Sequence, residues 1–288
     1  MARVGMIGLG NLGGPIGEQL AASGLTTTVY DTVPAATGPS VAAGATALGS
    51  PAEVAAASDV TLICVRTAEQ AADVLRGEDS LLDGAKPGHV VGLISTVLPD
   101  AVREFAELAA GHDVTLIDTP AAGTGEAGVR ARTMWTLAGG DDEAIDALEP
   151  ALRTYCSRVL RAGPLGSGAA AKLSHNAMIY LSYLATYEAT EVARAAGVRD
   201  GVLAEVTRAT GALSTQSDLY LGILEARRVI TGMDEDHDRF AGASAVLEKD
   251  LRHAIDLAAQ FGVDLPGARL VRTMGDTIFQ VRATGDPA

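Results

Sequence analysis

Cysteine, lysine and aromatic residues are scarce in this chain of 288 residues, and long apolar runs are absent from it. The two cysteines, Cys64 and Cys156, stand far apart within apolar or helical patterns, which predicts buried thiols and excludes a disulfide framework or a cysteine metal pair. No apolar run reaches the roughly 18 residues that a membrane helix needs. The first residues lead into a strand pattern and not into a signal-peptide core, so we expect a cytoplasmic protein.

Clustered positive charge is also missing. The net charge is -14 and the arginines are scattered, which excludes a nucleic-acid surface and favours a small-molecule partner. The acidic run at 234–238 has two possible interpretations, a weak metal site or a solvated loop. Because no partner cluster occurs elsewhere in the sequence, we expect no metal.

The first part of the chain alternates short apolar runs with alanine-rich segments of helical spacing. Strands of this apolar density, separated by helices, predict a doubly wound α/β domain whose parallel sheet is covered on both faces. The strands are expected at 4–8, 27–30, 59–65, 89–95, 114–118 and 135–138, and the helices at 16–23, 51–57, 68–75, 99–110 and 142–153.

The pattern changes after Gly163 and Pro164. Proline is absent from 167–196, which predicts one helix about 40 Å long at 1.5 Å per residue. The rest is helical throughout, with segments expected at 202–210, 218–230, 243–261 and 267–283. We therefore predict a dinucleotide-binding domain at 1–164 and an all-helical domain at 165–288, connected by the long helix.

A glycine-rich stretch directly follows the first predicted strand and opens the first predicted helix. In this context a G-x-G-x-x-G pattern aims backbone N–H groups and the helix dipole at a pyrophosphate. The first glycine makes the tight turn, the second lets phosphate approach the backbone, and the third lets helix and strand pack closely. The ligand predicted here is a dinucleotide, bound by Gly8, Leu9, Gly10, Asn11, Leu12 and Gly13.

Asp31 follows the second predicted strand, eighteen residues after Gly13, where such folds place an acid on the ribose hydroxyls. A carboxylate there repels a 2′-phosphate, and 32–38 contain no lysine or arginine, so NAD is favoured over NADP. Alternatively, Asp31 only caps the segment that follows. Val65 ends the third predicted strand and Arg66 lies just past it, where these folds gather ligands; Arg66 can equally be a solvated loop residue.

Lysine is represented by only three residues, against nineteen arginines, and Lys172 lies four residues before Asn176 on the predicted long helix. Their side chains therefore share one face. An ammonium group can exchange a proton with an oxygen whose charge changes during hydride transfer, and a neighbouring amide can hold that oxygen. The other interpretation is a surface lysine on a polar helix face.

These motifs together resemble the β-hydroxyacid dehydrogenase family, the relatives of 3-hydroxyisobutyrate dehydrogenase and tartronate semialdehyde reductase, over nearly the full length. The opening GLGNLGGPIGEQL is similar to the family's G-L-G-x-M-G-x-P-M-A-x-N-L, and Ser95-Thr96 with Pro99 to S-T-x-x-P. The segment 166–176 is similar to the catalytic G-x-G-x-x-x-K-x-x-x-N, and Lys249-Asp250-Leu251 to a K-D-L element.

The resemblance implies an NAD(P)-dependent oxidoreductase that moves a hydride between nicotinamide and a small β-hydroxyacid or its carbonyl form. It implies that Lys172 is the acid or base and that Asn176 orients the substrate. Thr96 and Lys249 are implied in cofactor binding. Because the helical domain is thin, and in the family packs against a partner subunit, a homodimer or larger homo-oligomer is expected.

The substrate loop departs from the family pattern D-x-P-V-S-G-G-x-x-G-A. Ala122 or Gly123 replaces the family serine, depending on the alignment, and Thr124 can supply a replacement hydroxyl. Substrate contacts are therefore assigned to these three residues together with Lys172 and Asn176. Beyond the loop, Arg132 and Trp135 form either a substrate anchor and pocket wall or a surface arginine and a core tryptophan.

Two other functions stay open. Imine reductases have a similar fold and opening motif, but their relatives generally replace the lysine and use NADP, so Lys172 and Asp31 disfavour them. The altered loop favours an imine reductase or a reductase of another non-acid carbonyl in specialised metabolism. A non-catalytic NAD-binding protein is disfavoured by the presence of Lys172, Asn176 and Lys249 together.

Overall fold

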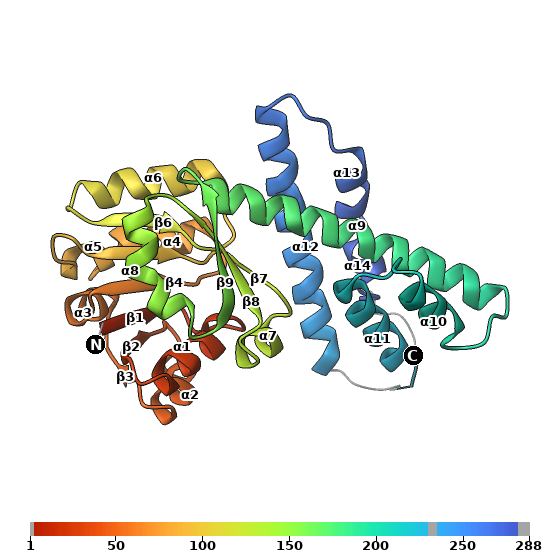
Figure 1. Cartoon of the computed structure of the whole chain (residues 1–288), viewed down its shortest axis with the longest axis horizontal. Coiled ribbons are helices and arrows are strands. Elements are labelled where there is room, and N and C mark those ends of the chain that lie inside the picture. The colour runs from red at the N-terminus through yellow and green to blue at the C-terminus, as the bar shows by residue number, and fades with distance from the viewer. Residues whose placement is uncertain (1–2, 230–234, 282–288) are drawn as a thin grey trace. The chain divides into compact units, whose positions relative to one another are not determined.

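The structure is a computed structural model that describes residues 3–229 and 235–281. It contains two compact units, Met1–Lys172 and Leu173–Ala288. The first unit combines a sheet with covering helices, and the second is helical, which confirms the predicted fold class (Figure 1).

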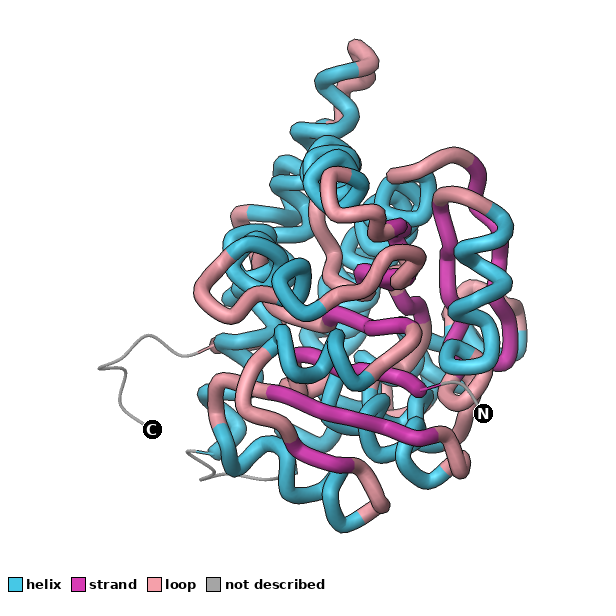
Figure 2. Tube along the Cα trace, turned by 90° about the vertical axis from the view of Figure 1, so that its left-hand side faces the viewer, coloured by secondary structure: helices cyan, strands magenta, loops and turns pink. Residues whose placement is uncertain are grey.

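One sheet runs through the first unit in the strand order β3-β2-β1-β4-β5-β6-β8-β7, with β9 paired to β8. The strands from β3 to β6 are parallel, as predicted, and their side-by-side course is visible in Figure 2. They are β1 (Arg3–Ile7), β2 (Thr26–Tyr30), β3 (Thr46–Ala47), β4 (Val60–Ile63), β5 (Val90–Leu93) and β6 (Thr115–Asp118). The last three are β7 (Ala121–Ala122), β8 (Met134–Gly139) and β9 (Cys156–Gly163).

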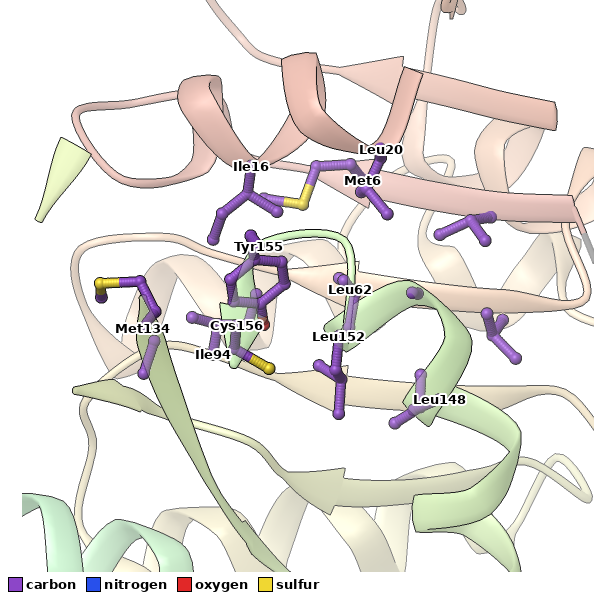
Figure 3. Close-up of a cluster of buried hydrophobic side chains, with 14 of the residues drawn as sticks. Met6, Ile16, Leu20, Leu62, Ile94, Met134, Leu148, Leu152, Tyr155 and Cys156 are labelled. Atoms are coloured by element: carbon purple, nitrogen blue, oxygen red, sulfur yellow. The ribbon is translucent and has the colours of Figure 1, made fainter. Parts of the chain in front are cut away.

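Helices cover both faces of this sheet because successive strand residues point to opposite sides. Met6 and Leu62 belong to one buried cluster, whereas their neighbours Ile7 and Ile63 belong to the other. The first cluster includes side chains of α1 (Gly13–Ala22), α7 (Glu126–Arg130) and α8 (Asp142–Leu152), as Figure 3 shows for α1 and α8. The second includes side chains of α3 (Pro51–Ala57), α4 (Ala68–Arg76), α5 (Leu81–Gly84) and α6 (Pro99–Ala110). The short η1 (Pro34–Thr37) and α2 (Gly38–Ala42) follow β2.

The second unit is built from helices around its own buried cluster. The helix α9 (Ser167–Ala195) begins in the first unit and continues into the second. It is followed by α10 (Val202–Ala209), α11 (Thr215–Val229), α12 (Glu235–Gln260), α13 (Pro266–Arg272) and α14 (Gly275–Ile278). The cluster is partly aromatic: the ring of Tyr183 stacks on that of Tyr220 with centroids 4.6 Å apart, and the Tyr220 hydroxyl donates to the Ile278 carbonyl.

Three strands were not predicted. The strands β3 and β7 have only two residues each, and β9 is exposed over most of its length, so none shows an apolar alternation. The strand β8 was expected, but it runs antiparallel to β6 and β7, so the sheet is not parallel throughout. Its direction depends on the short return through β7 and α7, which a hydrophobic pattern does not encode.

The prediction of one helix over 267–283 was wrong. The chain forms α13 and α14 with a break between them, and 282–283 lie outside the described residues. A Cβ at Gly275 would lie 2.5 Å from the Ser244 hydroxyl of α12, so this close approach needs glycine at the start of α14. The helix α12 also starts eight residues earlier than expected, within the acidic run.

Within the described ranges, no helix has the length and apolar character needed to cross a membrane.

Burial of His89 makes the stability of the first unit depend on pH. Its Nε2 lies 2.9 Å from the Thr61 hydroxyl in β4, and burial lowers its pKa to about 4. An unfolded histidine has a pKa near 6.5, so between these values the unfolded state binds the proton more tightly. The stabilisation is therefore complete above about pH 6.5 and is lost as the pH falls toward 4.

We expect the free energy of unfolding to drop by roughly 3 kcal/mol through this one group between pH 7 and pH 4. Urea unfolding of the wild type and of His89→Asn over this range measures it, with the exposed His112→Asn as matched control. An equally steep pH dependence in His89→Asn would contradict the assignment.

Candidate functional site

The register of the sheet aligns the ends of five strands in one row. Ile7 at the end of β1 pairs with Tyr30 and Ile63, Ile63 pairs with Leu93, and Leu93 pairs with Asp118. The residues that follow these strand ends therefore share the carboxyl edge of the sheet. They include Gly8, Asp31, Val65, Arg66, Thr96 and the loop 119–125. In doubly wound sheets, ligands bind at this edge where the strand order reverses, here between β1 and β4.

The glycine motif at this reversal point is constrained differently at its three glycines. Gly8 has a φ of +87°, and a Cβ there would lie 2.4 Å from the Cys64 carbonyl oxygen. A Cβ at Gly13 would lie 2.0 Å from the Gly8 oxygen. Gly10, in contrast, has no atom within 4 Å of its Cβ position. The chain's own packing thus requires Gly8 and Gly13, whereas Gly10 borders open space that a ligand can fill.

The helix α1 directly follows this loop, and its start is uncapped. Its N-cap residue, Leu12, has no side-chain hydrogen bond to the first turn, and the first turn contains no acidic residue. N–H groups at a helix start lack partners inside the helix and carry the positive end of its dipole. Asn11 and Leu12 therefore lead into a turn that suits an anionic group such as a pyrophosphate.

The Asp31 carboxylate accepts two backbone hydrogen bonds. Its Oδ2 accepts a hydrogen bond of 2.6 Å from the Leu9 N–H in the glycine loop, and its Oδ1 accepts one of 2.8 Å from the Val33 N–H. The carboxylate thus connects the end of β2 to the loop and also caps the next segment. Since each carboxylate oxygen can accept further hydrogen bonds, these contacts leave Asp31 able to bind a hydroxyl.

The other predicted cofactor residues of the first unit lie around the same point. The Val65 N–H donates to the Ser95 hydroxyl at 2.9 Å, and a Cβ at Gly8 would lie 3.0 Å from Val65 Cγ1. Thr96 follows Ser95 directly. Arg66 is exposed, and its backbone N–H donates to the Gln70 side chain at the start of α4. The structure therefore brings the ends of β1, β4 and β5 together.

The substrate loop is shaped by its glycines. Ala122 is buried in β7, opposite Trp135 in β8. A Cβ at Gly123, whose φ is +151°, would lie 2.5 Å from the sulfur of Met134, so the close approach of the loop to Met134 needs glycine. Thr124 packs against Gly128, with 2.9 Å between its hydroxyl oxygen and the Gly128 Cβ position.

The two residues beyond this loop lie on the surface of the protein. Arg132 has a φ of +55° and directs its Nε to within 3.4 Å of the Gln19 side-chain oxygen. Trp135 is 44% exposed, and the Arg158 guanidinium lies 5.6 Å from its ring. The interpretation of Trp135 as a core residue was therefore wrong, because almost half of its side chain is exposed.

Lys172 and Asn176 lie one turn apart on α9, as predicted. Lys172 is half-buried, whereas Asn176 is buried and its Nδ2 donates to Asp250 Oδ2 at 2.8 Å. Tyr180 donates to the same oxygen at 3.1 Å, and Lys249 Nζ lies 3.0 Å from Asp250 Oδ1. Because an ionised carboxylate only accepts hydrogen bonds, Asp250 fixes the amide orientation of Asn176.

Sequence reasoning missed Asp250 and Tyr180 as site residues. Burial and the Asp250 carboxylate raise the pKa of Tyr180 well above its ordinary range, which keeps its phenol protonated as a donor. The available signals were the position of Asp250 in the K-D-L element and the spacing of Tyr180 four residues after Asn176. Neither shows that Asn176, Tyr180 and Asp250 form one network.

No group of three or more metal-ligating side chains occurs among the residues that the structure describes. The acidic run at 234–238 lies outside the side chains so described.

Two models of known protein families match this chain. A family model of the NAD binding domain of 6-phosphogluconate dehydrogenase matches residues 3–163. A second, for the NAD-binding part of NADP-dependent 3-hydroxyisobutyrate dehydrogenase, matches residues 166–286. The chain belongs to the β-hydroxyacid dehydrogenase family. It is an NAD(P)-dependent oxidoreductase.

Two relatives illustrate the range of the family. The chain is 31% identical over 276 residues to an uncharacterized oxidoreductase of Mycobacterium tuberculosis, covering 93% of this chain and 90% of that protein. It is 30% identical over 220 residues to an NAD-dependent L-serine dehydrogenase of Pseudomonas aeruginosa, covering 76% of this chain and 74% of the relative.

Solved structures agree in fold. The structure of M. tuberculosis 3-hydroxyisobutyrate dehydrogenase with L-serine has a TM-score of 0.80 at 25% identity, covering 96% of this chain and 93% of that one. A Streptomyces aurantiacus imine reductase has a TM-score of 0.66 at 21% identity, covering 96% and 93%, and shares the fold.

The contrast between the motif glycines gives a test of the cofactor loop. Since the Cβ position of Gly10 is open, we expect Gly10→Ala to leave the melting temperature within about 2 °C of wild type. Its methyl group would fill the open space where we expect the phosphate, so NADH affinity should fall at least about tenfold, or roughly 1.4 kcal/mol.

Differential scanning fluorimetry and NADH fluorescence titration measure both effects. Gly38→Ala is the matched control, because its Cβ position is also open but lies in α2. Gly13→Ala should instead lose the fold. Unchanged NADH affinity in Gly10→Ala would exclude this loop as the phosphate site.

Proposed function

We propose that this enzyme transfers a hydride between NAD and a small β-hydroxyacid or its carbonyl form. The observation that carries the proposal is the carboxyl edge of the first unit: its glycine loop leaves open space at Gly10, and the helix that bears Lys172 starts at the same edge, beside Asp118. The bound nicotinamide supplies or accepts the hydride. Asp31 favours NAD, because its carboxylate repels a 2′-phosphate and 32–38 contain no cationic side chain.

Lys172 is proposed as the general acid or base. Its Nζ gives a proton to the substrate oxygen when the carbonyl is reduced and takes it back when the alcohol is oxidised. Asn176 orients that oxygen through the part of its amide that Asp250 leaves available. The amide is held by a buried network, so it adds little reorganisation to the reaction.

The substrate end is assigned to the loop Ala122, Gly123 and Thr124. This loop lacks a serine at the family position, and Thr124 is the residue among these three that carries a hydroxyl group. Relatives are named for 3-hydroxyisobutyrate and L-serine. Both compounds carry a hydroxyl group on the carbon β to a carboxylate, and we infer the same substrate class here. Lys249 remains a proposed cofactor-binding residue.

We also propose that the second unit packs against another copy of the chain. Several apolar side chains of this unit are exposed, among them Met178 on α9 at 69% and Phe261 directly after α12 at 75%. Analytical ultracentrifugation should then give a dimer or larger species at micromolar concentration, and Met178→Glu should shift it toward monomer. A wild-type monomer over the same range would refute this.

The substrate proposal is tested with purified protein, NAD or NADP, and a panel of 3-hydroxyisobutyrate, glycerate, 3-hydroxypropionate and L-serine, followed by nicotinamide absorbance. Turnover is expected on at least one acid, with NAD preferred. On that acid, Lys172→Ala should lower kcat by about 10²- to 10⁴-fold, the usual contribution of a positioned acid or base. More than a tenth of wild-type activity in Lys172→Ala would remove Lys172 from this role.

The altered loop also favours a second candidate, a reductase of imines or of another non-acid carbonyl, because neither Ala122 nor Gly123 offers the family's hydroxyl. Oxidation of NADH or NADPH by a cyclic imine such as 1-pyrroline, with no turnover on the acids, would establish it. Binding of NADH without turnover on either panel would instead indicate a non-catalytic dinucleotide-binding protein.

A further inference from the structure

Asp118 ends β6 and is 1% exposed, although it carries a carboxylate. Its Oδ1 accepts the Gly166 N–H at 2.8 Å, and its Oδ2 accepts the Ala169 N–H at 2.6 Å. These donors lie at the start of α9, where backbone N–H groups have no partners within the helix. All of these residues belong to the first unit. A single buried side chain thus attaches the first turn of α9 to the carboxyl edge of the sheet.

The glycines around Asp118 show how close this approach is. A Cβ at Gly168 would lie 2.1 Å from the Leu137 carbonyl oxygen and 2.8 Å from Asp118 Oδ2. A Cβ at Gly139, opposite Asp118 in β8, would lie 2.7 Å from Asp118 Oδ1. Any side chain at either glycine would therefore push α9 away from the sheet. The contact between the start of α9 and the Asp118 carboxylate therefore requires glycine at both positions.

Lys172 follows Ala169 by three residues, which is less than one helical turn. The backbone of Lys172 is therefore held rigidly relative to Asp118, and through it to β6. The loop 119–125, which we assign to the substrate, leaves β6 directly after Asp118. The same residue thus sets the start of the loop and the start of the helix at one edge of the sheet.

We propose that Asp118 is a positioning residue for the reaction, which places the Lys172 ammonium for proton transfer through the first turn of α9. The inference rests on the proposed role of Lys172. Asp118 itself does not touch the reacting atoms. Its action depends on accepting two backbone hydrogen bonds at once, which an asparagine in its place cannot reproduce, because the amide nitrogen would face an N–H donor.

The test is Asp118→Asn, alone and combined with Lys172→Ala. Displacement of a catalytic group by about 1 Å costs up to about 100-fold in rate, so we expect kcat to fall 10- to 100-fold in Asp118→Asn. KM and the NADH dissociation constant should stay within about threefold of wild type. In the Lys172→Ala background the same substitution should change the residual rate by less than about twofold, because a residue that acts through Lys172 is not additive with it.

Asp141→Asn is the matched control. Asp141 caps α8 by accepting the Glu143 and Ala144 N–H groups on Oδ1. An asparagine keeps that acceptor oxygen, so this variant makes the same Asp→Asn change at a helix start without removing the cap, on a helix that carries no proposed site residue. It should leave both the stability and kcat close to wild type, so a loss of kcat in Asp118→Asn alone is assigned to the two oxygens of Asp118. Gly168→Ala is a second variant, and its methyl group should give the same loss of kcat by lifting α9 off Leu137.

Hydrogen exchange of the peptide 164–172 gives a readout that is independent of turnover. Asp118→Asn should speed exchange there, while the peptide over α8 keeps wild-type protection. An additive loss in the double variant, or an unchanged kcat with faster exchange, would overturn the positioning role and leave Asp118 a structural cap. Full activity of Lys172→Ala would instead show that the proposed function had failed.

Discussion

The hydrogen bonds that Asp118 accepts from the start of α9 connect the substrate loop and the helix that bears Lys172, the two parts of the proposed chemistry in the first unit. The sheet presents its strand ends in one row, and Asp118 is the last residue of that row. Without its two acceptors, the N–H groups of Gly166 and Ala169 would be buried without partners, which costs about 1–3 kcal/mol for each group. The position of Lys172 therefore depends on contacts between distant parts of the chain, because Gly166 and Ala169 follow Asp118 by 48 and 51 residues.

The glycine loop solves a different physical problem at the same edge. Two of its glycines are required because the chain packs on itself at Gly8 and Gly13, while the third borders open space at Gly10. A loop that packs tightly at two points and stays open at one is pre-organised for a ligand. Asp31 adds to this order, since its hydrogen bond to the Leu9 N–H fixes the loop against the end of β2.

In the second unit, a buried polar network around Asp250 holds the proposed site residue Asn176. Asp250 accepts hydrogen bonds from Asn176 and Tyr180 and lies against the Lys249 ammonium, so its burial is compensated by three partners. Such a network defines one orientation of the Asn176 amide. The unit therefore presents this side chain with its donor and acceptor atoms assigned.

Local patterns in the sequence determined the doubly wound class, the positions of the first five main strands, the long helix, the glycine loop and the shared face of Lys172 and Asn176. Each depends on residues that are neighbours along the chain, whose periodicity reports burial directly. Only the tertiary structure decided the antiparallel direction of β8, the exposure of Trp135, the break between α13 and α14, and the partners of Asp118 and Asp250. Those features join residues tens of positions apart, and a hydrophobic pattern records that a residue is buried but not which distant donor or acceptor it meets.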